Sequence, residues 1–527
     1  MKHKISIIVA ALLAITMLSC REATDRLMTY DHIDHMAFAE ADTSFAGKFK
    51  VAWNGLNQYY AIWDYEAEMG VDWDDIYDKY LPKFEALDRQ ETVSDDELLD
   101  LMRQAFSPLH DGHLAISFKN HKTGTNELVF MPNEERLKSR DDYEAALNYS
   151  PSLNYYKQVA NDEIMTDADG NPIAKEFSSI LNDLLYDFVD TPDKGVRWIK
   201  DQIEELKGLP ELTEPQAYKL EQLESLLAEI RAKVIYVSRS TLDEYNQLAE
   251  KYASLQVPGF DYIDPGFWQY GMSLKYALLK GNIAYFYLSD FRLTPYLSSQ
   301  AANQCFNTSN TSTTENIRRM QTVWYAWFNA VQQLHKQGAL GGVIIDVRGN
   351  GGGMIDDFKF IAGSLLPGGK HQIGYQRFKN GTGRYDYSVL SPCTLNAMAD
   401  SLHEPITEPV VIMSNCRSIS MAEMTVLAVK TMPNGTAIGK RSSGGKCSLK
   451  SNNHSFTNNY MGYVGVRNET PVYVYLPSVA YITHDNKIIE GIGITPDIEV
   501  DLDANLFEAT GQDTQLDRAL QFIRTGN

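Results

Sequence analysis

Cysteine is scarce in this chain, with only five among 527 residues. None of them forms a CxxC pair or stands at a zinc-ligand spacing from histidine, so no zinc site is predicted. Basic residues are also outnumbered, 48 against 69 acidic ones, which gives a formal net charge of −21. A balance this acidic argues against nucleic-acid binding and favours solubility. The sequence implies no metal ion and no organic cofactor.

Long hydrophobic runs are missing as well. The apolar stretch from Ile5 to Leu18 is shorter than the roughly 20 residues that span a bilayer. It follows Lys2 and Lys4, and a basic start with a short apolar run is typical of a secretory signal. Because it leads to Cys20, it resembles a bacterial lipoprotein signal with Cys20 as the lipidated residue; an ordinary signal peptide is the alternative. We therefore expect a soluble body on a lipid tether in the cell envelope.

Two nucleotide-binding patterns are absent from the glycine loop, Arg348 to Gly353. Met354 stands where GxGxxG needs its third glycine, and no Gly-Lys-Ser/Thr follows. The loop alone is compatible with a structural turn or with backbone N–H groups presented to a negative charge. Asp167 to Pro172 lacks the spacing of an EF-hand, so an Asp-Gly turn is predicted there.

The length predicts several domains, because 527 residues are too many for one core. The apolar content of 44% is ordinary for globular protein. Aromatic and aliphatic residues at helical spacing follow the polar leader, and a second helical pattern precedes the strand-rich part. The predicted segments are a signal peptide (1–19), a tether (20–44), an N-terminal helical domain with His113 (45–120), an inserted, partly helical subdomain (121–272), an α/β core (273–510) and a C-terminal helix (511–527).

Strand and helix signals alternate in the predicted core. Gly281-Asn282, between two short apolar runs, is a strong hairpin signal. Thr313 to Lys336 is amphipathic at helical spacing and leads into the apolar strand Val343 to Val347. Strand, helix and strand in this order predict a βαβ unit. Residues 354–366 are predicted to be helical, and a second apolar strand runs from Val410 to Met413.

Ser420 lies between that second strand and a predicted helix from Met421 to Lys430. At such a junction a serine Oγ can be exposed, with the next N–H pointing into the same space. The structural alternative is that Ser420 is a helix N-cap, with Glu423 completing a capping box; a serine can be both a nucleophile and an N-cap. A serine here and the glycine loop before it suggest acyl transfer, with a nucleophile and an oxyanion hole.

Four motifs follow one another in the chain: Asp-x-Arg-x-Asn-x-Gly-Gly from Asp346, Ser-x-x-Glu from Ser420, Gly-x-x-Ser-x-Gly from Gly439, and Ile-Glu-Gly-Ile-Gly-Ile-Thr-Pro-Asp from Ile489. In this order they resemble the C-terminal processing peptidase family, which includes the tail-specific and tricorn-like peptidases. An Asp-Gly-His segment ending at His113 is similar to one that the family keeps near the end of its N-terminal helical domain. The resemblance spans roughly residues 274–505 and implies a crotonase-like (ClpP/crotonase) α/β fold.

The resemblance implies a serine peptidase and assigns roles by matched position. Ser420 would attack the scissile carbonyl, His113 would act as general base, and Glu490 would orient the imidazole. The N–H groups of Gly353 and Met421 would form the oxyanion hole. Histidine and acid at these positions are similar to the tricorn-like branch.

Lys446 is the alternative base. A second branch of the family uses a Ser/Lys dyad whose lysine directly follows the last glycine of a Gly-x-x-Thr-x-Gly motif. That position is Gly445 here, and Lys446 comes one residue later. Cys416 and Cys447 flank the serine region, where a disulfide and two free thiols are both open.

Two classes of function therefore compete. One is an exported serine peptidase that acts on peptide or protein substrates; the other is a non-catalytic lipoprotein that binds peptides or apolar ligands on the same fold. A crotonase-like acyl-CoA enzyme is disfavoured, because CoA substrates are cytosolic and the chain carries an export signal. The sequence predicts neither the oligomeric state nor the cleavage preference.

Overall fold

The computed structural model forms two compact units. Unit 1 contains the chain up to Ser139 with Gly374–Cys393 and Gly445–Gly491, and unit 2 contains the remaining segments. The residues that the structure describes are 42–124, 127–147, 149–151, 153, 156, 201–213, 215–225, 272–297, 311–381, 383–446, 461–464 and 472–526.

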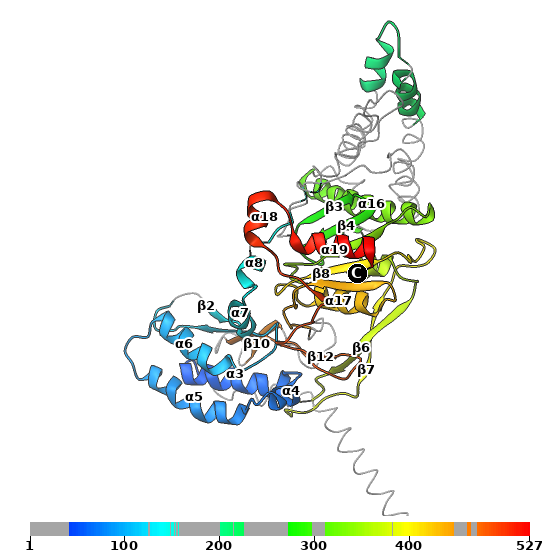
Figure 1. Ribbon diagram of the computed structural model, residues 1–527. Coiled ribbons are helices and arrows are strands. Elements are labelled where there is room, and N and C mark those ends of the chain that lie inside the picture. Colours follow the sequence, from blue (N-terminus) through cyan, green and yellow to red (C-terminus); the bar gives the residue numbers. More distant parts are fainter. Residues whose placement is uncertain are drawn as a thin grey trace, which may run out of the picture. The chain divides into compact units, whose positions relative to one another are not determined.

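Unit 1 begins with four helices in the region predicted to be helical. Figure 1 shows the longer ones, in blue, lying side by side. Their aromatic residues form the core, where the rings of Phe49 and Phe84 stack 4.6 Å apart. Ser94 caps the last helix, because its Oγ accepts the Glu97 N–H at 3.2 Å. The helices are α3 (Phe45–Tyr59), α4 (Trp63–Glu68), α5 (Trp73–Asp88) and α6 (Asp95–Phe106).

An antiparallel sheet completes the core of unit 1, in the order β10-β11-β1-β2. Ile116 and Phe118 of its strand β1 are fully buried in the same cluster as the helices. A buried strand therefore follows His113 closely in the chain. The strands are β1 (Ala115–Lys119), β2 (Glu127–Phe130), β10 (Met461–Val464) and β11 (Val472–Tyr475), and helix α7 (Pro132–Lys138) follows β2.

A second sheet has the order β12-β6-β7. Its strands are β12 (Val479–Ile482), β6 (Lys370–Phe378) and β7 (Ser391–Asn396). Strand β12 pairs with β6 in antiparallel register, with Val479 opposite Phe378. Glu490, on the chain beyond β12, belongs to unit 1.

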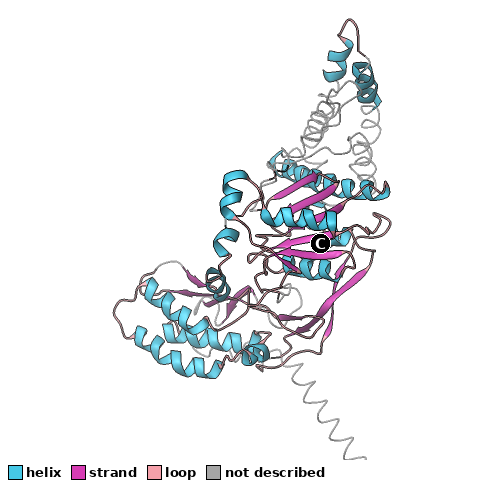
Figure 2. Ribbon diagram, in the orientation of Figure 1, coloured by secondary structure: helices cyan, strands magenta, loops and turns pink. Residues whose placement is uncertain are grey.

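Unit 2 is built on a six-stranded sheet in the order β13-β9-β8-β5-β4-β3. Only the β3–β4 hairpin is antiparallel; the other pairs of this sheet are parallel. Figure 2 shows helices flanking these strands. The predicted α/β class is thus confirmed. The strands are β3 (Leu274–Leu279), β4 (Ile283–Leu288), β5 (Gly342–Asp346), β8 (Val410–Ser414), β9 (Gly435–Gly439) and β13 (Ile498–Glu499).

The predicted hairpin and crossover both occur. Gly281 and Asn282 have φ of 87° and 56°, the left-handed values that a tight hairpin turn requires. Helix α16 (Thr311–Lys336) joins β4 to the parallel strand β5, as the βαβ prediction requires. Its Trp327 ring lies 4.9 Å from Phe286, so α16 covers one sheet face.

The opposite face packs against helix α19 (Thr514–Thr525), which lies where a C-terminal helix is predicted. Helix α17 (Met421–Thr431) follows β8, close to its predicted bounds. Unit 2 also contains the short helices α8 (Tyr143–Leu147), α14 (Thr294–Leu297) and α18 (Ala504–Thr510). Residues 201–207 and 215–225 are helical too.

The helix predicted over residues 354–366 is wrong in type. The segment forms two 3₁₀ helices, η1 (Ile355–Phe360) and η2 (Ala362–Ser364). Long-range bonds explain the tighter winding, since the Asp357 carboxylate accepts the N–H groups of Leu293 and Thr294 at 2.5 and 2.6 Å. These bonds pull the segment towards another loop, and local helix propensity does not outweigh them.

Some predictions fall outside the described residues. They concern the signal sequence, Cys20, the Asp-Gly turn at 167–172, Cys447 and most of the insertion, so the predicted domain boundaries remain predictions. Cys393 and Cys416 are buried free thiols. Within the described ranges, no helix combines the length and apolar character needed to cross a bilayer.

Candidate active site

Ser420 has an unusual backbone. It sits between the end of β8 and the first residue of α17, with φ of 62° and ψ of −120°. Among the described residues other than glycine, only Asn282 and Asn486 share a positive φ, and asparagine tolerates this region better than serine. Holding a serine there costs roughly 1–3 kcal/mol, and such strain clusters at functional sites.

The turn before Ser420 is tied to the end of β5. Ser418 Oγ donates to the Val347 carbonyl at 2.7 Å, and Ile419 donates its N–H to the Asn350 carbonyl at 3.1 Å. In a third bond the glycine loop is the donor: the Gly349 N–H donates to Asn415 Oδ1 of the turn at 2.9 Å. Strand ends β5 and β8 are neighbours in the parallel sheet, so their loops meet at the same edge.

Glu423 holds the turn from inside. It is fully buried at N3 of α17, in the predicted capping box, and its Oε2 accepts the Ser420 N–H at 3.3 Å. Its Oε1 accepts the Ser442 hydroxyl at 2.5 Å and the Gly444 N–H at 2.8 Å. The carboxylate thus links the serine turn to the Gly-x-x-Ser-x-Gly motif, which sequence reasoning did not foresee.

The glycine loop lies directly against Ser420. A Cβ added to Gly352 would lie 2.5 Å from Ser420 Cβ and 2.9 Å from the Ile419 carbonyl oxygen. Gly352 also has φ of 84°, which a side chain would strain. Only glycine therefore allows this loop to approach the serine.

Nearly every N–H group of the glycine loop has a partner within unit 2. Gly353 is the exception: its N–H makes no hydrogen bond to the described residues, and the residue is exposed. The N–H groups of residues 349 to 352 donate to Asn415 Oδ1, the Val347 carbonyl, the Ser289 carbonyl and Asn350 Oδ1, and Met354 donates to the Phe291 carbonyl.

The Met421 N–H likewise makes no hydrogen bond to the described residues, as expected for the first residue of a helix. Both N–H groups predicted for the oxyanion hole are therefore available donors in segments that contact Ser420. Donors of this kind can stabilise an anion that forms beside the serine.

Arg348 supports the loop and does not face solvent. It is fully buried, and its guanidinium pairs with Asp346 at 2.6 Å and with Asp513 at 2.8 Å. It also lies 4.1 Å from the centre of the Tyr149 ring. Removing one partner of such a buried pair costs several kcal/mol, so Arg348 anchors the end of β5 to the segment before α19.

His113 belongs to unit 1, in the loop between α6 and β1. Its N–H donates to Asp111 Oδ1 at 2.7 Å, and the Leu114 N–H donates to the same atom at 3.0 Å. The residue is partly exposed, but its Nδ1 is buried with no hydrogen-bond partner in the described part of the chain. Burial lowers the pKa of His113 to about 4, so the ring is neutral near pH 7.

Glu490 and Lys446 meet at the same loop. The fully buried Glu490 carboxylate accepts the Gly112 N–H at 3.1 Å through Oε2 and the Lys446 N–H at 2.7 Å through Oε1. Lys446 Nζ lies 4.6 Å from the centre of the Tyr481 ring. The structure thus brings Glu490 to the main chain beside His113.

His110, the other histidine of the segment, has a structural partner. Its Nδ1 lies 2.7 Å from the buried Glu66 carboxylate, and its N–H donates to Glu66 at 2.8 Å. Glu66 also accepts the Tyr60 hydroxyl at 2.6 Å. This pairing gives His110 a structural role in unit 1.

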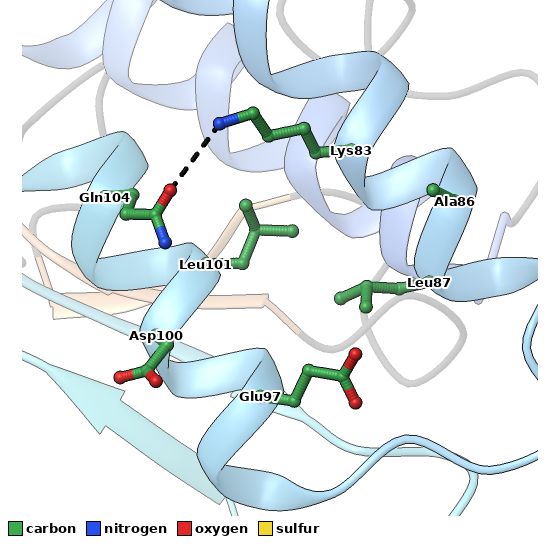
Figure 3. A pocket seen from close by; sticks show the side chains of 7 residues that line it. All are labelled: Lys83, Ala86, Leu87, Glu97, Asp100, Leu101 and Gln104. Carbon is green, nitrogen blue, oxygen red and sulfur yellow. Dashed lines mark hydrogen bonds between the residues drawn. The ribbon is translucent and has the colours of Figure 1, made fainter.

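A surface hollow of about 510 Å³ lies between α5 and α6 (Figure 3). Its side chains include Lys83 and Gln104, which form a hydrogen bond of 3.5 Å. Apolar and carboxylate side chains complete the lining, with no serine, cysteine or histidine among them. The hollow therefore lacks a nucleophile and a base.

The structure collects the predicted residues into two groups. Ser420, Gly353 and Met421 lie in unit 2, and His113, Glu490 and Lys446 lie in unit 1. Sequence reasoning missed two contributions, that of the Asp two residues before His113 and the extended role of the capping-box glutamate. An Asp before Gly-His is a recognisable signal for a side chain that bonds the N–H two residues on.

Residues 313–500 match the model of peptidase family S41. The chain therefore carries a peptidase domain of this family, and the resemblance derived from the motifs is confirmed. A search of curated proteins found no match.

Similar solved structures include a candidate peptidase from Parabacteroides merdae, with 17% identity, 92% of this chain and 98% of the other covered, and a TM-score of 0.45. Mature CPAF with lactacystin has 11% identity, 92% and 99% coverage, and a TM-score of 0.45. The photosystem II D1 C-terminal processing protease has 19% identity, 47% and 49% coverage, and a TM-score of 0.27. The family match, and not these distant likenesses, is the basis of the assignment.

Proposed function

We propose that this S41 peptidase uses Ser420 as nucleophile, His113 as general base and Glu490 as the acid that orients the histidine. The observation that supports this most directly is the serine turn. Ser420 is held in a strained conformation against Gly352, and the Gly353 N–H is the one loop donor without a described partner. A merely structural cap would need neither feature.

In the proposed reaction, Ser420 Oγ attacks the carbonyl carbon of the scissile peptide while its proton passes to the His113 ring. The oxyanion accepts hydrogen bonds from the Gly353 and Met421 N–H groups. Collapse of the intermediate breaks the C–N bond, and the amine leaves with the proton from His113. Water then attacks the acyl-serine while His113 accepts its proton; the ester bond to Ser420 Oγ breaks, and His113 returns the proton to that oxygen.

The neutral state of His113 fits this role. Its lowered pKa, about 4, leaves a nitrogen lone pair free near pH 7. Lys446 is the alternative base, and its Nζ faces an aromatic ring in a buried position, at 1% exposure of the residue. A matched pair of alanine variants separates the two bases.

The test is cleavage of a mixed peptide library by the full chain, read by mass spectrometry. We expect Ser420→Ala and His113→Ala each to lose cleavage by about 10⁴-fold or more, and Lys446→Ala to keep it. Cleavage that survives His113→Ala and disappears in Lys446→Ala would show that the lysine is the base. A wild type that retains peptides without cutting them would support the binding-lipoprotein alternative.

Export and lipid anchoring are part of the same proposal. They rest on the basic start, the short apolar run and Cys20. Metabolic labelling with a fatty acid should mark the wild type in the cell envelope, and Cys20→Ser should abolish the label. A wild type that stays unlabelled would contradict lipidation and leave the peptidase proposal intact.

A further inference from the structure

Three consecutive main-chain N–H groups around His113 donate hydrogen bonds to two buried carboxyl groups. Glu490 Oε2 accepts the Gly112 N–H at 3.1 Å, and Asp111 Oδ1 accepts those of His113 and Leu114 at 2.7 and 3.0 Å. In addition, Asn133 Nδ2 donates a longer hydrogen bond to the Gly112 carbonyl at 3.4 Å. The main chain on both sides of the His113 Cα is thus fixed by side chains.

Asp111 makes an exceptional contribution to this loop. The residue is fully buried, and its Oδ2 has no hydrogen-bond partner among the described residues. Burial and the neighbouring charges of Glu490 and Glu66 raise the pKa of Asp111 well above its ordinary value. A surface turn would bond the same N–H groups without placing a carboxyl in this costly environment.

We propose that Asp111 is a positioning residue for the histidine base: it fixes the His113 side chain by holding the main-chain N–H groups on either side of its Cα. This proposal rests on the proposed function of His113. Asp111 acts through the backbone and does not touch the ring. Glu490 completes the grip through Gly112, which is one physical route by which that acid orients the histidine.

Only the carbonyl-like oxygen of Asp111 is needed for this role. An asparagine amide oxygen can accept the same two N–H groups, so Asp111→Asn keeps the grip. Alanine removes this acceptor, so the N–H groups of His113 and Leu114 lose their partner. Of the three donors, only the Gly112 N–H keeps a carboxylate, that of Glu490. A displacement of about 1 Å in a base costs on the order of 100-fold in turnover.

The experiment compares kcat and KM of the wild type, Asp111→Asn and Asp111→Ala on one peptide substrate. Asp72→Ala is the matched control, because Asp72 Oδ1 also accepts two N–H groups, those of Asp74 and Asp75, at the start of α5 in the same unit. We expect Asp111→Ala to lower kcat by on the order of 100-fold with little change in KM. Asp111→Asn and Asp72→Ala should stay within about threefold of the wild type.

Three outcomes would overturn the inference while the peptidase itself remains active. The first is an unchanged kcat in Asp111→Ala. The second is a folded Asp111→Asn whose kcat falls as far as that of the alanine variant, since the acceptor oxygen is kept. The third is an equal loss in Asp72→Ala, which marks general destabilisation. If circular dichroism shows that Asp111→Ala does not fold, the kcat of the folded asparagine variant still tests the inference. An inactive wild type would count against the proposed function instead.

Discussion

The serine turn of unit 2 and the histidine loop of unit 1 share one device. Each is held by a fully buried glutamate that accepts two main-chain N–H groups. In unit 2, Glu423 accepts those of Ser420 and Gly444. In unit 1, Glu490 accepts those of Gly112 and Lys446. In both units, a buried carboxylate therefore ties a predicted catalytic loop to a second stretch of chain.

The two loops differ in how the side chain is presented. Ser420 is held in a strained backbone by close glycine packing, whereas His113 lies in a turn closed by a second carboxyl, Asp111. A small nucleophile can be aimed by backbone strain, because its single χ angle leaves little else to control. A larger ring depends on the direction of its Cα–Cβ bond, and fixing the neighbouring N–H groups controls that direction.

The largest effect is expected from filling the space beside Ser420. In Gly352→Ala the new Cβ would meet Ser420 Cβ at 2.5 Å with φ of 84°. We expect cleavage to fall by at least about 100-fold and the free energy of unfolding to drop by roughly 1–3 kcal/mol. Kinetics and urea denaturation measure both.

Gly351→Ala is the control for that change. Its Cβ would have only Asp290 Oδ1 nearby, at 3.7 Å, and its φ is not positive. We expect near-normal cleavage and stability. Equal losses in both variants would show that the loop tolerates no side chain anywhere, and the specific contact with Ser420 would lose its support.

Removing the glutamate of the serine turn should have the next largest effect. Glu423→Ala leaves the Ser442 hydroxyl and two main-chain N–H groups without their buried acceptor. We expect the free energy of unfolding to fall by roughly 2–4 kcal/mol. Glu97→Ala, at the exposed N3 position of α6, should change it by less than about 0.5 kcal/mol. If both variants lost only a similar, small amount of unfolding free energy, the stabilising role assigned to the Glu423 carboxylate would be wrong.

A smaller effect is expected from the titration of His113. Because the folded pKa, about 4, lies below the usual value of 6.5, the neutral ring adds stability above pH 6.5 that is lost as the pH falls towards 4. Between about pH 7 and pH 4.5 the wild type should lose roughly 1–2 kcal/mol more than His113→Gln, after allowance for partial exposure. Parallel stability curves for the two proteins would refute a buried, neutral histidine.

The smallest effect is expected from the Lys446 side chain. Lys446→Ala keeps the main-chain N–H that Glu490 accepts and loses the contact with Tyr481. We expect kcat within about threefold of the wild type and a stability loss of roughly 0.5–2 kcal/mol. A loss of kcat as large as that of Ser420→Ala would show that the Lys446 side chain is needed for catalysis, and would contradict the assignment of His113 as the base.

Local signals predicted much of the fold. Gly281-Asn282 marked the hairpin, and the apolar runs before Arg348 and Asn415 marked two strands, which the structure shows to be parallel neighbours. Each depends on residues close in sequence, where turn chemistry and periodicity act directly. The segment after the glycine loop was predicted less well, because bonds from Asp357 to a distant loop set its winding.

The supporting residues were harder to foresee. Glu490 bonds Gly112 across 378 positions, and nothing in the local sequence of either residue indicates the partner. Ser420 could be singled out as a serine before a helix, but neither its positive φ nor its close packing against Gly352 can be read from the local sequence. Motif matching therefore nominates the reacting groups, and the structure adds what holds them.

The most direct test of the account is labelling of the full chain with a fluorophosphonate probe, followed by mapping of the modified residue by mass spectrometry. We predict that Ser420 carries the label, that His113→Ala slows labelling by about 100-fold or more, and that Lys446→Ala labels normally. Modification of another serine, or no modification of Ser420 in a folded, peptide-cleaving protein, would contradict the central claim.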